Sequence, residues 1–384
     1  MEYYSALTGL RSVGAFLVFC HHFYGQWFPD KSFPGFFLQE GYIGVSIFFT
    51  LSGFLITRTY MSKLGSGPVR FREYWVRRFA RVYPLYCLLL SWKFLVRPDL
   101  VKSTGQLVVN FTLSQAFFHS WIWTGIAPAW SLTVEESFYF LAPSVFFIIR
   151  SRSVARAFWV LLAFTVAFWV LGDLICWIMA RGDFFASLMV HQYNLLGRFG
   201  EFALGVFIAF VVEKMSCEKE YCEKLPIGAE TAFFGGVILI ALSLGILSLL
   251  RERTHQEFGI LSSYGFAACT PASVGTVLLI IAALKGSAFS KVLLGNRCVE
   301  YLGRVSYAFY LLQDRFFANP VTGLWKNEFV PVFLSLTVLS IFVYELAEKP
   351  LHRRVIAFMS RAKKTVSPPS SPGTIGILAR RPSV

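Results

Sequence analysis

The first long apolar stretch of the chain carries two side chains that could take part in chemistry, Arg11 and His22. Their separation is about three turns of an α-helix, so both would lie on one face, within roughly 20° and roughly 16 Å apart along the axis. A guanidinium can hold an anionic donor, and an imidazole can transfer a proton near neutral pH. We expect the two groups to face one watery cavity and the adjacent His21, about 100° away on the helix, to be a bystander. The alternative is an interfacial Arg11 and a structural, hydrogen-bonded His22.

A second group of polar side chains begins the apolar stretch from residue 130 to 149. Glu135 and Tyr139 are four residues apart and would share one helix face, and Ser131 lies four residues before Glu135. A carboxylate beside a tyrosine in an apolar setting could orient a histidine or act as a base itself. The alternative is that Glu135 and Glu136 only satisfy the free N–H groups and the dipole at a helix N-terminus.

A third group consists of Arg78 and Arg81 at the start of another apolar stretch. Three residues apart on a helix, the two guanidiniums would lie on one side, where they match phosphate groups well. The alternative is that these arginines anchor the protein at the membrane surface or bind lipid headgroups.

Other catalytic motifs are missing from the sequence. It contains no G-x-S-x-G nucleophile elbow and no G-x-x-x-x-G-K-[ST] phosphate loop, so we expect neither that type of hydrolase nor ATP-driven transport by this chain. The remaining histidines are scattered without ligand spacing, and we expect no metal site.

The elements that must position these groups are indicated by the composition. Of 384 residues, 55% are hydrophobic and only 15% are charged, with a mean hydropathy of +0.57. Soluble proteins carry about 25% charged residues, so a disordered chain and an ordinary cytosolic enzyme are excluded. The net charge of +14 comes from residues at the ends of apolar runs, not from one polar face, which disfavours nucleic acid as a partner.

Long apolar runs recur along the whole chain and predict an all-α integral membrane protein of about ten transmembrane helices. The stretch 105–122 is shorter and more polar, and we interpret it as interfacial or re-entrant. The ten predicted spans are 7–24, 41–60, 79–96, 132–149, 157–179, 196–213, 231–250, 262–284, 300–318 and 330–346.

The loops on one side of this arrangement carry most of the Lys and Arg residues, so we expect both termini to lie in the cytoplasm. We expect the membrane to be the inner or plasma membrane of the cell. We expect one membrane domain over residues 1–354 and a basic, Ser- and Pro-rich cytoplasmic tail over 355–384 that is disordered. We expect no cleaved leader and no appended soluble domain.

In order and spacing, these motifs resemble membrane-bound acyltransferase family 3, of the O-antigen and exopolysaccharide O-acetylase type. The matching segments extend from residue 7 to about 354 and include the run from Gly41 to Ile56 and the segment from Ser306 to Leu311. They also include Glu348-Lys349-Pro350 near the end of the apolar region.

The resemblance implies an enzyme that uses cytoplasmic acyl-coenzyme A, with acetyl-coenzyme A as the expected donor, and acylates a hydroxyl of a carbohydrate or glycolipid. The site residues of the family would correspond to Arg11 and His22, to Arg78 and Arg81, and to Glu135 with Tyr139 in this sequence. In the mechanism that we expect, the three arginines bind the coenzyme A phosphates or hold the thioester end in register, and His22 takes the proton of the acceptor hydroxyl. Glu135 orients His22 or stabilises its imidazolium, and Tyr139 donates to the oxyanion. Direct transfer and a covalent acyl-His intermediate both stay open.

One departure from the family pattern is Gln313, which stands where relatives often carry His. Two other functions stay open at this stage. A transporter or flippase would also carry Arg, His and Glu within the membrane, although we find no inverted repeat in the sequence. A non-catalytic scaffold would not depend on Arg11 or His22.

Overall fold

The computed structural model describes residues 4–27, 37–64, 68–180, 190–214, 226–254 and 261–364. All regular elements in these residues are helical. The α-helices are α1 Ser5–Trp27, α3 Gly44–Leu64, α4 Pro68–Val96, α5 Thr104–Phe111, α6 Trp130–Ile149, α7 Val154–Ala180, α9 Leu195–Lys214, α11 Ala229–Thr254, α12 Leu261–Leu284, α13 Arg297–Leu311, α14 Arg315–Leu324, α15 Phe329–Val343 and α16 Lys349–Lys364.

Short turns of 3-10 and π-helix join or extend these elements. They are the 3-10 turns η1 Glu40–Ile43, η2 Pro98–Leu100, η3 Gln115–Phe117 and η4 Ala127–Ala129, and the π-helical turns η5 Ser290–Leu294 and η6 Tyr344–Glu348.

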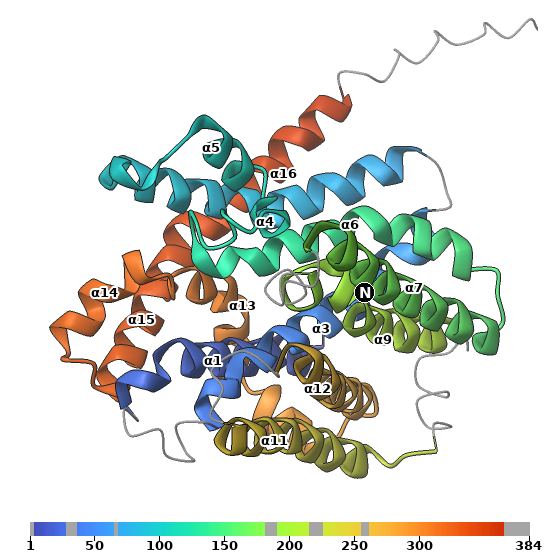
Figure 1. Ribbon diagram of the computed structural model, residues 1–384. Coiled ribbons are helices and arrows are strands. Elements are labelled where there is room, and N and C mark those ends of the chain that lie inside the picture. The colour runs from blue at the N-terminus through green and yellow to red at the C-terminus, as the bar shows by residue number, and fades with distance from the viewer. Residues whose placement is uncertain are drawn as a thin grey trace, which may run out of the picture.

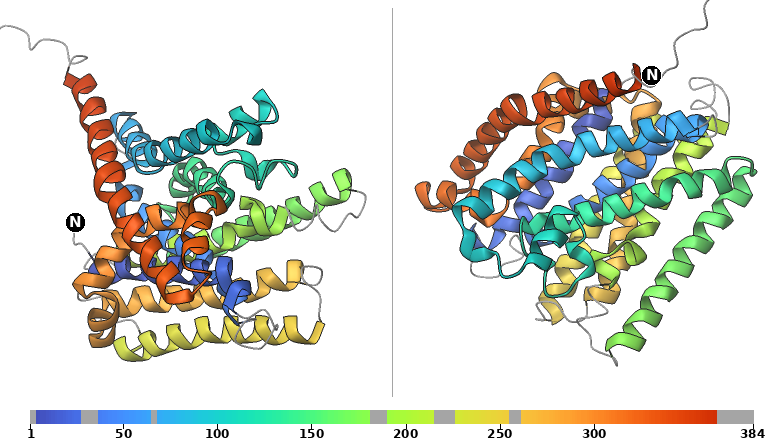
Figure 2. Two further views of the ribbon diagram at one scale, coloured as in Figure 1. Left: turned by 90° about the vertical axis from the view of Figure 1, so that its left-hand side faces the viewer. Right: turned by 90° about the horizontal axis from the view of Figure 1, so that it is seen from above.

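Helices α1 and α3 lie in the middle of the bundle, between the α11–α12 hairpin on one side and α4 and α6 on the other (Figure 1). Seen from above, most long helices run in similar directions, and α16 lies alongside α4 (Figure 2). The centre of the molecule is therefore formed by the helix that carries Arg11 and His22.

Glycines allow the central helices to approach closely. A Cβ at Gly205 of α9 would collide with the Thr50 carbonyl oxygen of α3, and one at Gly53 of α3 would collide with the Phe202 carbonyl oxygen of α9. In the same way, Gly303 of α13 lies against the backbone of Thr8 in α1. Small residues at helix contacts are typical of membrane bundles, where close packing holds the helices together.

The prediction of an all-α membrane protein is confirmed, but the count of about ten spans is not. Seven stretches of the described residues are long and apolar enough to cross a membrane. They are Phe37–Lys63, Phe71–Val96, Ala127–Ile149, Val154–Ile178, Val190–Lys214, Ala229–Leu250 and Phe329–Met359.

The other three predicted spans differ in separate ways. The span 7–24 corresponds to α1, which carries an arginine and two histidines, and the span 262–284 corresponds to α12, of which Cys269–Leu284 forms a shorter apolar helix. The span 300–318 is wrong as one helix, because it breaks into α13 and α14. The cause of the break is Asp314, whose carboxylate accepts a hydrogen bond from the Phe316 N–H and begins a new helix.

Two other predicted segments have clear local structures. The stretch 105–122 contains only the short α5, the turn η3 and irregular chain, so it is too short in any one helix to span a bilayer. Residues 355–364, which fall within the predicted tail, are helical as the end of α16. Residues 365–384 of the predicted tail lie outside the described part of the chain.

Candidate active site

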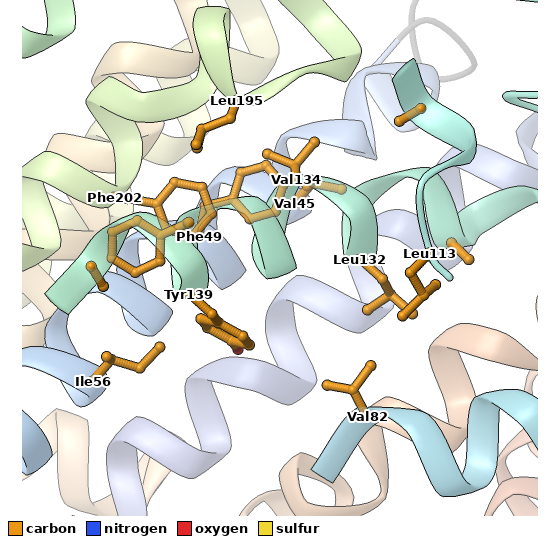
Figure 3. Packing of buried hydrophobic residues seen from close by; sticks show 14 of the residues in the cluster. Val45, Phe49, Ile56, Val82, Leu113, Leu132, Val134, Tyr139, Leu195 and Phe202 are labelled. Carbon is orange, nitrogen blue, oxygen red and sulfur yellow. The ribbon is translucent and has the colours of Figure 1, made fainter. Parts of the chain in front are cut away.

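A small cavity of about 60 Å³ lies between α1, α3, α4, α6 and α13. Its charged lining groups are Arg11, Arg81 and Glu135. The other lining residues are Val45, Phe48, Phe49, Ser52, Val82, Ser131, Leu132, Ser306, Tyr307 and Tyr310. Figure 3 shows that part of this lining is continuous with the apolar core, where the rings of Phe49 and Phe202 stack with centroids 4.6 Å apart.

Glu135 is fixed in the cavity by two hydroxyl donors. Ser52 of α3 donates to its Oε1 at 2.5 Å, and the Tyr139 hydroxyl, one turn further along α6, donates to the same oxygen. The predicted shared face of Glu135 and Tyr139 is therefore confirmed. Because its donors come from two helices, the carboxylate has a defined position relative to both α3 and α6.

Arg78 does not line the cavity; it contacts the ring of Tyr139, whose hydroxyl holds the cavity residue Glu135. Its guanidinium lies 5.3 Å from the centroid of the Tyr139 ring and 5.4 Å from that of Tyr60. A cation over an aromatic face is attracted by the ring quadrupole. Arg81, one turn later on α4, lines the cavity itself, so the two predicted arginines have different positions.

Arg11 lines the cavity together with Arg81 and Glu135. It interacts electrostatically with Arg81, Glu135, Tyr139 and Arg78. Five of the six predicted site residues thus gather at one end of α1.

His22 lies at the other end of α1 and does not line this cavity. It is exposed, and its Nδ1 is 2.8 Å from Oε1 of Gln313. Ala15 and Val18, which follow Arg11 on the same helix face, are each only 2% exposed. The expected single cavity joining Arg11 to His22 is therefore not found among the described residues, because packed side chains fill the face between them.

The structure also does not bring Glu135 to His22. Glu135 is bonded to Ser52 and Tyr139, whereas the group beside His22 is Gln313. His21, the expected bystander, has its Nδ1 2.5 Å from the Gln39 carbonyl oxygen and so links α1 to the segment before η1.

One site residue that the sequence reasoning did not assign is Glu348. It lies in the π-helical turn η6, and its Oε2 is buried without a hydrogen-bond partner among the described residues. Its carboxylate interacts with Arg81 and Arg11. The motif Glu348-Lys349-Pro350 was a signal for this position, but the sequence alone did not show that it faces the arginines. Single-turn π-helices are frequent at functional sites.

Two tyrosines of α13 were also missed as lining groups. The Tyr310 hydroxyl donates to the Pro128 carbonyl oxygen at 2.9 Å and lies 2.7 Å from Ser131 Oγ. Tyr307 donates to the Val82 carbonyl oxygen at 2.7 Å. Their spacing of one helical turn was the available signal.

Within the described ranges, no group of three or more His, Cys, Asp or Glu side chains could hold a metal ion.

Comparison with known proteins decides the family. A family model described as an acyltransferase domain, that of acyltransferase family 3, matches residues 4–344. The chain belongs to this family.

Curated relatives of this acyltransferase family member include "O-acetyltransferase OatA" of Staphylococcus aureus strain NCTC 8325, which is 23% identical over 94% of this chain and 60% of the relative. Another is "Putative O-acetyltransferase SACOL0978" of Staphylococcus aureus strain COL, 23% identical over 93% of this chain and 58% of the relative. The chain thus spans about three fifths of the length of these relatives. No solved structure matches it significantly.

Proposed function

We propose that this protein is a membrane O-acyltransferase that moves an acetyl group from acetyl-coenzyme A to a hydroxyl of a carbohydrate or glycolipid. The observation that carries the proposal is a cavity within an apolar bundle. It is lined by Arg11, Arg81 and a Glu135 carboxylate that accepts two hydrogen bonds. Ionisable groups in a membrane are costly and need a function or a partner. Membership of an acyltransferase family and the names of its O-acetyltransferase relatives support acetyl transfer as that function.

In this proposal the donor enters the cavity at the end of α1 that carries Arg11. Arg11 and Arg81 hold the anionic coenzyme A, since guanidiniums bind phosphates with two parallel hydrogen bonds. Arg78 acts through Tyr139, whose ring it contacts, and Tyr139 in turn holds Glu135. The thioester passes the rings of Phe48 and Tyr310, which line the cavity and contact each other edge to face at 6.0 Å.

In this proposal His22 performs the proton transfer at the other end of α1, which the thioester reaches only when the side chains packed between the two ends move apart. The acceptor hydroxyl gives its proton to His22 while its oxygen attacks the thioester carbonyl carbon. The carbon–sulfur bond breaks, and the coenzyme A thiolate leaves and takes the proton from the imidazolium. The acceptor oxygen ends as an ester, and His22 returns to its neutral form.

We propose further that both termini lie in the cytoplasm and that the membrane is the plasma membrane. The distribution of Lys and Arg supports this orientation. It places Arg11 near the cytoplasmic face, where coenzyme A is available, and His22 toward the opposite face, where surface carbohydrates are built.

The test uses purified protein in lipid vesicles with radiolabelled acetyl-coenzyme A and a thiol reagent that reports free coenzyme A. The proposal predicts release of coenzyme A that matches label on an added glycan acceptor. Arg11→Ala should abolish both signals, while Arg97→Ala should leave them unchanged, because Arg97 pairs with Asp99 on an exposed loop. Transport of label without coenzyme A release would instead support a transporter, and no signal in either assay would support a scaffold.

A further inference from the structure

The turn between α13 and α14 holds Gln313 against His22. Gln313 is 3% exposed, although it stands only two residues after the end of α13. Its amide has two partners on α1, the His22 ring and the Ala15 backbone. Neither partner could be found from the sequence, because both lie almost three hundred positions away in the chain.

The two contacts define which way the amide points. The Gln313 Nε2 donates to the Ala15 carbonyl oxygen at 3.3 Å, and its Oε1 therefore faces the His22 Nδ1 at 2.8 Å. A carbonyl oxygen can only accept a hydrogen bond, so the Nδ1 must carry the hydrogen. A neutral imidazole with its hydrogen on Nδ1 has its lone pair on Nε2, where it can accept a proton.

The turn itself is anchored by a buried ion pair. Asp314, next to Gln313, pairs with Lys93 of α4 at 2.7 Å. Lys93 also donates to the Gly125 carbonyl oxygen at 2.5 Å, and Asp314 accepts from the Ala127 N–H at 2.8 Å. The position of Gln313 is thus set by α4 and by the segment that enters α6, as well as by α1.

The group that accepts the hydrogen bond from His22 Nδ1 is the uncharged amide of Gln313. The charged groups around His22 explain why no carboxylate takes that place. Among the described residues, those that act electrostatically on His22 are His21, whose ring centroid is 5.4 Å away, and Arg315 at the start of α14. Both are basic. The nearest carboxylate in the turn, Asp314, is already paired with Lys93.

We propose that Gln313 is a positioning residue that fixes the Nδ1-protonated tautomer of His22 and leaves Nε2 free to take the proton of the acceptor hydroxyl. The proposal rests on the proposed function and gives to Gln313 the role that the sequence assigned to Glu135. In the transfer step the proton moves from the hydroxyl to Nε2, while the Nδ1 hydrogen stays on its bond to Gln313. The resulting imidazolium is stabilised by that bond and later gives the Nε2 proton to the leaving thiolate.

The experiment compares the pH profiles of kcat for acetyl transfer by full-length protein in lipid vesicles. Gln313→Leu keeps a similar volume but removes the acceptor, so kcat should fall about tenfold or more with little change in KM. Gln313→Glu restores an acceptor oxygen, so it should recover activity and move the acidic limb of the profile to higher pH by about one unit or more. Asn319→Ala, an exposed amide change on the neighbouring α14, should keep the wild-type profile.

A spectroscopic measurement does not depend on activity. With ¹⁵N-labelled histidine, the resonances that disappear in His22→Ala identify His22, and the proposal predicts a protonated Nδ1 and an unprotonated Nε2 in the neutral form. Gln313→Leu should shift this tautomer balance. An Nε2-protonated His22 in the wild type, or a Gln313→Leu protein with unchanged tautomer and unchanged kcat, overturns the proposal. A wild type without acetyl transfer would instead reject the proposed function and leave the tautomer measurement to decide the role of Gln313.

Discussion

At the scale of single residues, the proposed function depends on how one carboxylate is held in an apolar bundle. Glu135 accepts hydrogen bonds from Ser52 and Tyr139, and Tyr139 is also the ring beneath Arg78. The hydroxyl and the ring of Tyr139 therefore have separate tasks, which substitutions can distinguish.

Tyr139→Phe removes only the hydroxyl and keeps the ring for Arg78. A hydrogen bond to a charged group contributes about 1.5–3 kcal/mol, so kcat/KM for acetyl transfer should fall roughly ten- to hundredfold if the bond acts in the transition state. The matched control is Tyr74→Phe, which loses a bond to the Tyr139 carbonyl oxygen and none to a carboxylate. Equal kcat/KM values for the two variants would show that the hydroxyl of Tyr139 has no role in the site.

Arg78→Lys keeps the charge but loses the flat guanidinium that lies between Tyr60 and Tyr139. An ammonium can keep one cation–π contact but cannot lie flat against both rings, so about 0.5–2 kcal/mol is lost and activity should fall roughly two- to thirtyfold. Arg72→Lys is the control, since Arg72 is exposed and makes one long bond of 3.5 Å to the Met359 carbonyl oxygen. Similar small losses in both variants would argue for a general surface charge at this position.

The residue pairs that sequence reasoning could predict are those within one helix. The spacing of Glu135 and Tyr139 predicted their contact correctly because helical geometry alone decides it. The partners of His22 and Arg78 come from other helices, and no periodicity in one segment shows which helix lies opposite. The expected pairing of Glu135 with His22 was not found for this reason.

At the scale of elements, close contacts between helices fix the position of α3, which lines the cavity. Gly205→Ala would force α9 away from the Thr50 backbone of α3, the helix that carries Ser52 and Phe49. Overpacking typically costs about 1–3 kcal/mol, so the midpoint of thermal unfolding should fall and activity should decrease with it.

The control for this substitution is Gly245→Ala on α11, where an added Cβ meets nothing within 4 Å. Replacing a glycine within a helix by alanine stabilises it by about 0.5–1 kcal/mol, so this variant should unfold at the same or a higher temperature. A Gly205→Ala protein as stable as Gly245→Ala would show that the α3–α9 contact is looser than described.

The ion pair of Lys93 and Asp314, with its backbone hydrogen bonds, connects α4, the turn before α14 and the segment that enters α6. Lys93→Met leaves a buried carboxylate without its partner, which costs about 3–5 kcal/mol, and differential scanning fluorimetry should show a strongly lowered unfolding temperature. Adding Asp314→Asn to the same chain should recover part of the loss. A single variant that unfolds like the wild type would mean that the pair does not hold the turn.

This break in the helix was hidden from the sequence. Residues 300–318 are apolar enough to be taken for one span, and only the structure shows that the Asp314 carboxylate caps α14 at the Phe316 N–H and is held there by Lys93 and the Ala127 N–H. The long apolar stretches such as Val154–Ile178 were predicted well, because length and hydropathy alone define them.

At the scale of the whole molecule, the proposed orientation assigns opposite faces to the two ends of α1. In a background without native cysteines, Lys102→Cys should react with an impermeant maleimide in intact cells. Arg152→Cys should react only after the membrane is permeabilised. The reverse pattern would place Arg11 on the outer side and contradict donor entry from the cytoplasm.

The central claim is that His22 transfers the proton of the acceptor hydroxyl in acetyl transfer. Its most direct test is mass spectrometry of surface glycans from cells that express wild type, His22→Ala or His119→Ala at equal membrane levels, His119 being an exposed loop histidine. The account predicts O-acetyl groups with wild type and His119→Ala and none above background with His22→Ala. Wild-type acetylation by His22→Ala would contradict it.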